Sequence, residues 1–129
     1  MTARRGASAL EFAFVLPILV VILFGLLDWG WYMYSWMNVE LAANRGARIA
    51  AGIVDDPALA ATDAARATLD GYAMVCPDDA VTYVAQADGS GQITVNLPYT
   101  PLLGLVPTPA RVWARASTDW YGDLYAPGG

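Results

Sequence analysis

The distribution of hydrophobic and polar residues divides the chain into an apolar N-terminal part and a mixed C-terminal part. Residues 12–27 carry no charge and are almost entirely apolar. These 16 residues would form about 24 Å of helix at a rise of 1.5 Å per residue, close to the roughly 30 Å hydrocarbon core of a bilayer. After Gly52 apolar and polar residues alternate more evenly. The pattern predicts a membrane-spanning helix followed by one small domain.

The helical pattern continues beyond the apolar run. Nothing breaks it before residue 51, so we expect one helix from about Ala7 to Ala51, with Gly52 as its stop. Pro17 removes one backbone hydrogen bond and is expected to kink or loosen the span. Small residues at positions 42–51 would let another backbone approach, although the helix propensity of alanine explains them equally well. Aromatic residues typical of a membrane interface follow the span: Trp29, Trp31, Tyr32, Tyr34 and Trp36.

A second helix is predicted from Pro57 to about Val75. Asp56 can cap its free N–H groups, and Pro57 suits the first helical position. A calcium site at Asp55 and Asp56 is a weaker alternative, because no further oxygen ligands follow at regular spacing. The residues expected on one face of this helix are Leu59, Ala65, Leu69, Tyr72 and Ala73.

Beyond Pro77 the period changes from helical to alternating. Strands are predicted at 81–85, 93–99 and 110–120, with hairpin residues at 88–91 and a proline-rich loop at 100–109. In the last strand Val112, Ala114, Ala116 and Thr118 would face one way. The expected fold class is α+β: a long N-terminal transmembrane helix that continues into a small domain with a second helix and a three-stranded antiparallel sheet.

Composition and charge argue against several classes of function. The net charge is −5, lysine is absent and the seven arginines are scattered, so we expect no nucleic-acid partner. Histidine, a glycine-rich phosphate loop and a Cys/His ligand set are also absent from the sequence. We therefore expect no enzyme activity, catalytic residue, metal, cofactor or small-molecule substrate. Asp78 and Asp79 could pair as acid and base, but a solvated turn is the favoured interpretation. The single Cys76 is expected to act as a small hydrophobe.

Charges near the two ends of the span bear on its orientation. Arg4 and Arg5 are expected to stay cytoplasmic, which sends the C-terminal domain across the membrane. Arg45 and Arg48 weigh the other way but lie far from the span. Asp28 either marks its outer edge, which we favour, or pairs with a partner's arginine. A cleaved secretory signal is disfavoured because the apolar run lacks a small-x-small cleavage site.

Glu11 follows Gly6 by five residues and immediately precedes the span. A carboxylate at a membrane usually has a partner, because an unpaired charge is costly there. The alternative is that Glu11 sits among the headgroups, close to the N-terminal arginines.

The sequence from Arg5 to Pro17, followed by Phe24-Gly25 and by residues 42–48, resembles the TadE-like family of minor pseudopilins from tight-adherence pilus systems. Its first part is similar to the class III signal of type IV pilin-like proteins. This resemblance implies that a prepilin peptidase cuts between Gly6 and Ala7.

The resemblance also implies that Glu11 and Phe12 dock the chain onto another subunit, with Glu11 meeting the new amine of a neighbour. The expected organisation is a cytoplasmic leader at 1–6, a transmembrane and extended helix at 7–52, and an extracytoplasmic domain at 53–129.

The implied function is a minor pseudopilin in pilus assembly or initiation, held in the inner membrane by a single N-in span and available for incorporation into a surface pilus. The implied partners are prepilin peptidase, other pilin-like subunits in a homo- or hetero-oligomer, and membrane lipid. Two alternatives stay open. One is a structural subunit of another pilus or type II-like pseudopilus, and the other is an uncleaved single-pass anchor with an extracytoplasmic binding domain.

Overall fold

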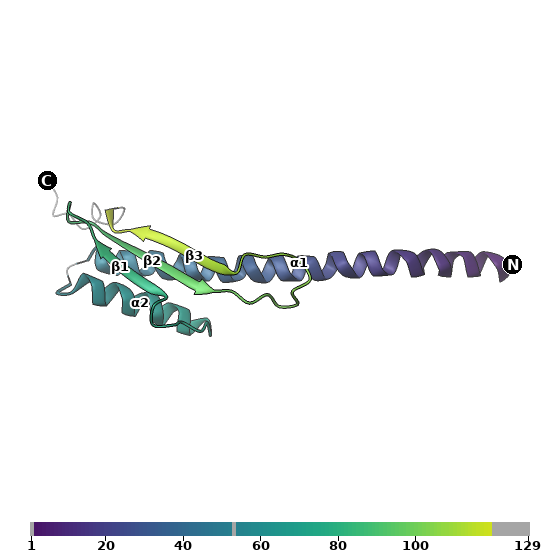
Figure 1. Ribbon diagram of the computed structural model, residues 1–129, viewed down its shortest axis with the longest axis horizontal. Helices are drawn as coiled ribbons and strands as arrows, with labels where there is room; N and C mark the ends of the chain where they lie inside the picture. The colour runs from purple at the N-terminus through teal and green to yellow at the C-terminus, as the bar shows by residue number, and fades with distance from the viewer. Residues whose placement is uncertain (1, 53, 120–129) are drawn as a thin grey trace. The chain divides into compact units, whose positions relative to one another are not determined.

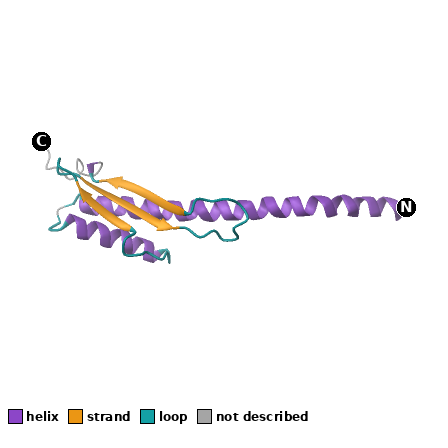
Figure 2. Cartoon of the chain, in the orientation of Figure 1, coloured by secondary structure: helices purple, strands orange, loops and turns teal. Residues whose placement is uncertain are grey.

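The computed structural model describes residues 2–52 and 54–119, with only the backbone described at 2–5. The elements in chain order are α1 (Thr2–Ala50), α2 (Pro57–Gly71), β1 (Val81–Ala85), β2 (Gly91–Pro98) and β3 (Arg111–Ser117), as Figure 1 shows. Two helices and one antiparallel sheet confirm the predicted α+β class (Figure 2).

The described chain divides into two compact units. The first, here called the helix–loop unit, contains residues 2–33 and 100–108. The second, the helix–sheet unit, contains residues 34–52, 54–99 and 109–119. The predicted boundaries separate a leader at 1–6, a membrane helix at 7–52 and an extracytoplasmic domain at 53–129. They are defined by expected function and not by compact packing, and they stay predictions.

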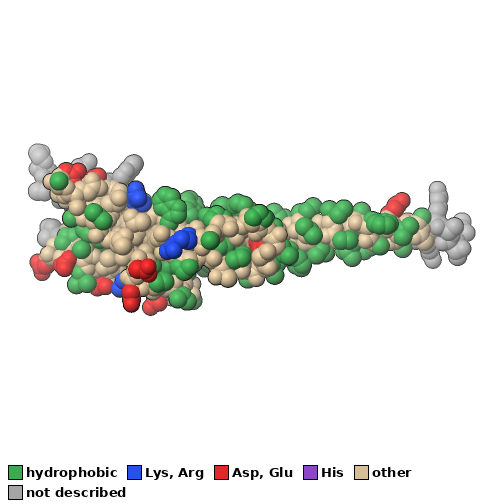
Figure 3. Space-filling view, viewed as in Figure 1, with side chains coloured by type: hydrophobic (Ala, Val, Ile, Leu, Met, Phe, Trp, Pro, Cys, Tyr) green, Lys and Arg blue, Asp and Glu red, His purple; other side chains and the backbone are tan. Residues whose placement is uncertain are grey.

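Helix α1 is long and apolar enough to cross a membrane. It begins at Thr2, five residues before the predicted start, and ends at Ala50, close to the predicted end. Pro17 lies inside the helix without ending it, and the predicted kink there stays a prediction. Hydrophobic side chains cover the visible face of its N-terminal half (Figure 3). Among the described residues α1 is the one helix with this length and composition, which supports a membrane-anchored single-pass protein.

The start of α2 confirms the predicted cap. The backbone N–H of Leu59 donates to Oδ1 of Asp56 at 3.1 Å, and Asp56 has the extended backbone of a capping residue. The buried residues of α2 are Ala61, Ala65, Thr68 and Leu69, which follow the helical period. The predicted face was therefore wrong in part, since Leu59, Tyr72 and Ala73 are exposed. Leu59 is two positions from Ala61, which places it on the opposite side of the helix.

Helix α2 ends at Gly71, four residues before the predicted Val75. Ala73 has a φ of 54°, and its N–H donates to the carbonyl of Asp70 at 2.9 Å. The N–H of Met74 donates to the carbonyl of Leu69 at 3.1 Å. This pair of bonds is a Schellman motif, which satisfies the last carbonyls of the helix and turns the chain away.

The sheet has the order β1-β2-β3, with both pairs antiparallel. Val81 pairs with Val95 and Leu97 pairs with Val112. Alternate residues of β2 and β3 are buried, so one sheet face forms part of the core. Thr118 is also buried and bonds Gly91 through both its amide and its hydroxyl, at 2.8 and 2.7 Å. The predicted facing of β3 is confirmed over 112–118, whereas Trp120 lies outside the described residues.

The turn between β1 and β2 falls at the predicted position. Ser90 donates to Oδ1 of Asp88 through its amide at 2.9 Å and its hydroxyl at 2.7 Å. These two bonds favour the charged carboxylate and lower the pKa of Asp88. Gly89 has a φ of 89°, which the turn requires and which glycine adopts without strain.

The core of the helix–sheet unit forms where α1, α2 and β2 meet at Gly46. A Cβ added to Gly46 would lie 2.8 Å from the carbonyl oxygen of Ala61 and 2.5 Å from Cδ1 of Ile93. Glycine is therefore required for this close approach. The small residues of α1 thus pack against the chain's own domain, and those that are buried are Ala42, Ala43, Gly46, Ala47 and Ala50.

Candidate functional site in the N-terminal helix and its docked loop

The predicted cleavage position lies on an open part of α1. Gly6 and Ala7 are both exposed, and a Cβ on Gly6 would meet no atom within 4 Å. The position is therefore accessible to an enzyme, and the cleavage itself stays a prediction.

The two predicted docking residues are also exposed. Phe12 has 62% of its surface accessible, and Glu11 on the same helix is also exposed. Most apolar side chains from Leu10 to Leu27 are exposed, whereas Val20, Phe24 and Gly25 are partly covered. This surface suits lipid or apolar protein neighbours, and the docking role of Glu11 and Phe12 stays a prediction.

Asp28 closes the apolar run in an arrangement that sequence reasoning missed. Its side chain is fully buried in the structure. The backbone N–H of Leu103 donates to Oδ1 of Asp28 at 2.7 Å, and that of Leu105 donates to Oδ2 at 3.0 Å. The sequence had suggested either the edge of the span or a partner's arginine. These bonds show that Asp28 also holds the loop between β2 and β3 against α1, which can be followed in Figure 1.

The loop is shaped for this contact. Gly104 has a φ of 70°, a left-handed conformation that turns neighbouring N–H groups toward one side. Such a concave set of amides binds an anion, and here the anion is the Asp28 carboxylate. Gly25 lies one turn earlier on α1, and a Cβ there would lie 3.1 Å from Cγ2 of Val106. The loop therefore contacts α1 at two successive turns.

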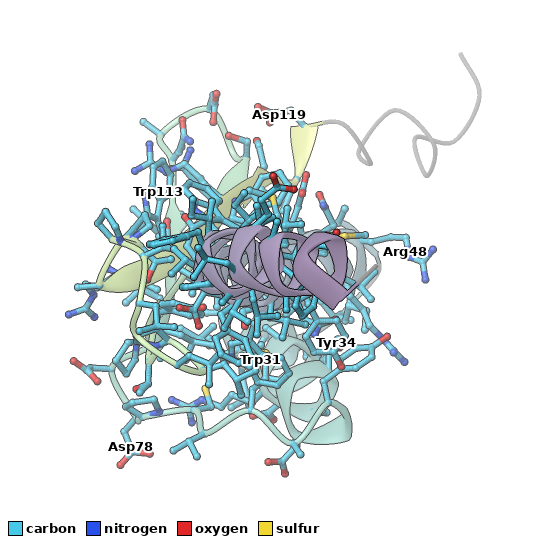
Figure 4. The ribbon with its side chains drawn as sticks, turned by 90° about the vertical axis from the view of Figure 1, so that its right-hand side faces the viewer. Trp31, Tyr34, Arg48, Asp78, Trp113 and Asp119 are labelled. Carbon is cyan, nitrogen blue, oxygen red and sulfur yellow. The ribbon has the colours of Figure 1, made fainter. Side chains whose placement is uncertain are left out.

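The helix–sheet unit carries a groove of about 580 Å³ between α1 and α2. Its lining combines the aliphatic Leu41 and the aromatic Tyr72 with Arg45 and Arg48. Both arginines are exposed, and Figure 4 shows Arg48 projecting away from the helix. The groove is amphipathic, with its charge contributed by α1.

The remaining candidate residues have structural explanations. Asp78 and Asp79 lie exposed in a turn that the N–H of Ala80 closes on the carbonyl of Pro77 at 3.0 Å. Figure 4 shows Asp78 at the periphery, in agreement with a solvated turn. Cys76 is half-buried, and burial raises the pKa of its thiol. Within the described side chains, no cluster of three or more His, Cys, Asp or Glu residues could hold a metal ion.

Comparison with known proteins identifies the N-terminal part of the chain. The sequence model of the TadE-like protein family matches residues 6–48. Neither the curated proteins nor the solved structures contain a match. The matched segment begins at Gly6 and includes Glu11, Pro17 and Asp28. Residues 6–48 are thus similar to the TadE-like family, which confirms the predicted resemblance for this part of the chain.

Proposed function

We propose that the chain is a minor pseudopilin that takes part in the assembly or initiation of a tight-adherence pilus. The observation that carries the proposal is the match of residues 6–48 to the TadE-like family. The proteins of this family are structural and related to pili. The match covers the long apolar helix and begins at the residue after which a prepilin peptidase would cut. The helix–sheet unit is an additional domain. It favours a minor component, because the main pilin of such systems is expected to be little more than the helix.

Processing is the first step of the proposed function. A prepilin peptidase cuts between Gly6 and Ala7 and leaves Ala7 as the new N-terminus. The open surroundings of Gly6 support this step, because a small residue in open space is easily admitted to an enzyme's pocket. The matured helix then starts four residues before Glu11, so its amine and carboxylate lie on the same face.

Subunit docking is the second step. The Ala7 amine of one subunit pairs with Glu11 of a neighbour, and Phe12 adds apolar contact. The exposure of Glu11 and Phe12 supports this role, since both side chains are available to a partner. The pair is an interaction between opposite charges in an apolar setting, where such bonds are strong. The partners are other pilin-like subunits.

Orientation follows from the basic residues that precede the span. Arg4 and Arg5 hold the N-terminus in the cytoplasm, so the helix–sheet unit lies outside the cytoplasmic membrane. A reporter that is active only outside the cytoplasm, fused after Gly129, should be active. Activity of a cytoplasmic reporter at the same position would contradict the orientation.

The experiment that tests the proposal is mass spectrometry of the N-terminus of the chain from cells with and without the peptidase. We expect a chain beginning at Ala7 only in cells that have the enzyme. Replacing Gly6 by Leu should leave the full-length precursor, whereas Gly30→Leu, at another open glycine of α1, should be processed normally. A wild-type chain that keeps residues 1–6 would favour the uncleaved membrane anchor. Abundance in sheared fibres would instead favour a major structural subunit of a pilus or pseudopilus.

A further inference from the structure

We propose that the loop of residues 100–108 is seated in the lipid interface of the membrane, beside the end of the span that Asp28 marks. The proposal rests on the membrane anchor and on contacts within the helix–loop unit. It depends neither on peptidase processing nor on pilus assembly.

The depth of the loop is set by its two contacts with α1. Val106 lies against Gly25, which is inside the uncharged run of residues 12–27. The amides of Leu103 and Leu105 are bonded to Asp28, one turn further along the helix. If α1 crosses the membrane through its uncharged run, the loop lies at the depth of the last turn of that run.

The side chains of the loop suit this depth. Residues 100–108 contain no charged residue. Leu102, Leu103 and Leu105 remain 56, 46 and 57% exposed although the loop is docked. In water these three leucines would leave an unfavourable apolar patch, whereas in lipid they extend the exposed apolar surface of the span. That surface includes the neighbouring Leu26 and Leu27, which are 67 and 46% exposed.

The backbone of the loop also suits an interface. Irregular backbone is tolerated at membrane depth only where its polar groups find partners. Asp28 accepts two of the loop amides, and Pro101 and Pro107 have no N–H to satisfy. Headgroups and interfacial water can meet the remaining groups. The aromatic rings just beyond Asp28 indicate the same depth, since Trp29 and Trp31 are 42 and 43% exposed.

Lipid is the occupant that these observations favour. The three leucines belong to a loop that is docked at the last turn of the uncharged run, where Leu26 and Leu27 are also exposed, and the loop offers no charge for a complementary protein surface. Because the loop is uncharged, its seating should not depend on anionic lipid.

The test uses the full chain with Cys76→Ala, a single new cysteine and an environment-sensitive nitrobenzoxadiazole label. The label is placed at Leu102→Cys or, independently, at Leu105→Cys, and the protein is reconstituted into phosphatidylcholine vesicles. Leu19→Cys in the span and Val84→Cys on β1 serve as controls, since these side chains are 55 and 60% exposed. Fluorescence is measured with aqueous iodide and with two doxyl lipids, one labelled near its headgroup to reach the interface and one labelled near the end of its acyl chain to reach Leu19 at the centre of the span.

We expect both loop labels to show blue-shifted emission, to lose most of their fluorescence to the doxyl lipid labelled near its headgroup and to resist iodide. Adding phosphatidylglycerol should leave these results unchanged. The proposal would be overturned if iodide quenches the loop labels and neither doxyl lipid does, while the doxyl lipid labelled near the end of its acyl chain does quench the label at Leu19. Protection that disappears when the protein is diluted in lipid would also overturn it, by assigning the patch to a second copy of the chain. If the label at Leu19 lies outside the lipid, both this proposal and the membrane anchor are wrong. That result would say nothing about cleavage after Gly6.

Discussion

The carboxylate of Asp28 accepts a hydrogen bond from the backbone amide of Leu103 at 2.7 Å, across 75 positions of sequence. The bond joins the end of the apolar run to the loop between β2 and β3. A charge that would be costly at a membrane is thereby paired with the backbone of its own chain. This contact gives Asp28 partners within its own chain, and pairing with a partner's arginine stays an untested alternative.

Replacing Asp28 by Asn should release the loop. The carboxamide presents an NH₂ group where the carboxylate accepted an amide, and the charge is lost. We expect hydrogen exchange at the Leu103 and Leu105 amides to become faster, by about ten- to a hundredfold. The matched control is Asp63→Asn, an exposed carboxylate of α2. Unchanged exchange in the Asp28 variant would show that the loop is held by other contacts.

Glu11→Gln tests the docking role. The substitution keeps the size of the side chain and removes its charge, so insertion should survive while pairing with an amine loses its charge-assisted part. We expect normal membrane levels and N-terminal processing, but loss of most co-purification with partner pilins in mild detergent and fewer surface fibres. Glu40→Gln, an exposed glutamate further along α1, is the control. Intact complexes and normal fibres in the Glu11 variant would make the uncleaved anchor the better account.

Gly46→Ala should destabilise the helix–sheet unit. The new Cβ would lie too close to the backbone carbonyl of Ala61, so α2 would have to move. We expect a loss of about 1–3 kcal/mol in the free energy of unfolding, followed by circular dichroism during denaturation in detergent. Gly30→Ala on the same helix meets no atom within 4 Å and should be neutral or slightly stabilising. Equal stability of the two variants would show that the contact at Gly46 is loose.

Ala73→Gly should stabilise the chain. Ala73 has a φ of 54° in the Schellman motif that ends α2, a conformation that costs alanine more than glycine. We expect a gain of about 0.5–1 kcal/mol in the free energy of unfolding, the strain relief being offset in part by the greater entropy of glycine in the unfolded chain. Ala67→Gly, at an exposed interior position of α2, should instead cost about 1 kcal/mol. A loss of stability in the Ala73 variant would contradict the inference that Ala73 is strained at the end of α2.

Alkylation of Cys76 should depend on pH in a manner set by burial. Burial raises the pKa of the thiol in the folded chain, so the reactive thiolate forms only at higher pH than in the unfolded chain. Below the pKa of the thiol in the unfolded chain, Cys76 is protonated in both states and the folded chain keeps its full stability. The folded chain loses stability as the pH rises from that value through the higher pKa of the folded state, because the buried thiolate is disfavoured. We expect the rate of iodoacetamide reaction to rise at higher pH in the folded protein than in denaturant. A midpoint at or below that of the denatured chain would contradict the effect of burial.

Local patterns were sufficient for much of the fold. The uncharged run before Asp28 predicts the membrane helix because charge is excluded from a bilayer over a fixed length. Asp56 and Pro57 predict the start of α2 because a cap acts within three residues. Alternation predicts the strands, and residues 88–91 predict their turn, because both signals lie within a few positions of each other. The TadE-like resemblance is equally a property of contiguous sequence, and the match over 6–48 confirms it.

Tertiary structure decided what depends on distant residues. The end of α2 was mispredicted because Ala73 adopts a conformation more typical of glycine, which only the bonds to Asp70 and Leu69 reveal. The role of Gly46 required α2 and β2 to be in place, since a missing side chain has meaning only beside the atoms that would meet it. Asp28 is the clearest case. Its partners come from a loop 75 and 77 positions away, and backbone amides leave no side-chain signal in the sequence.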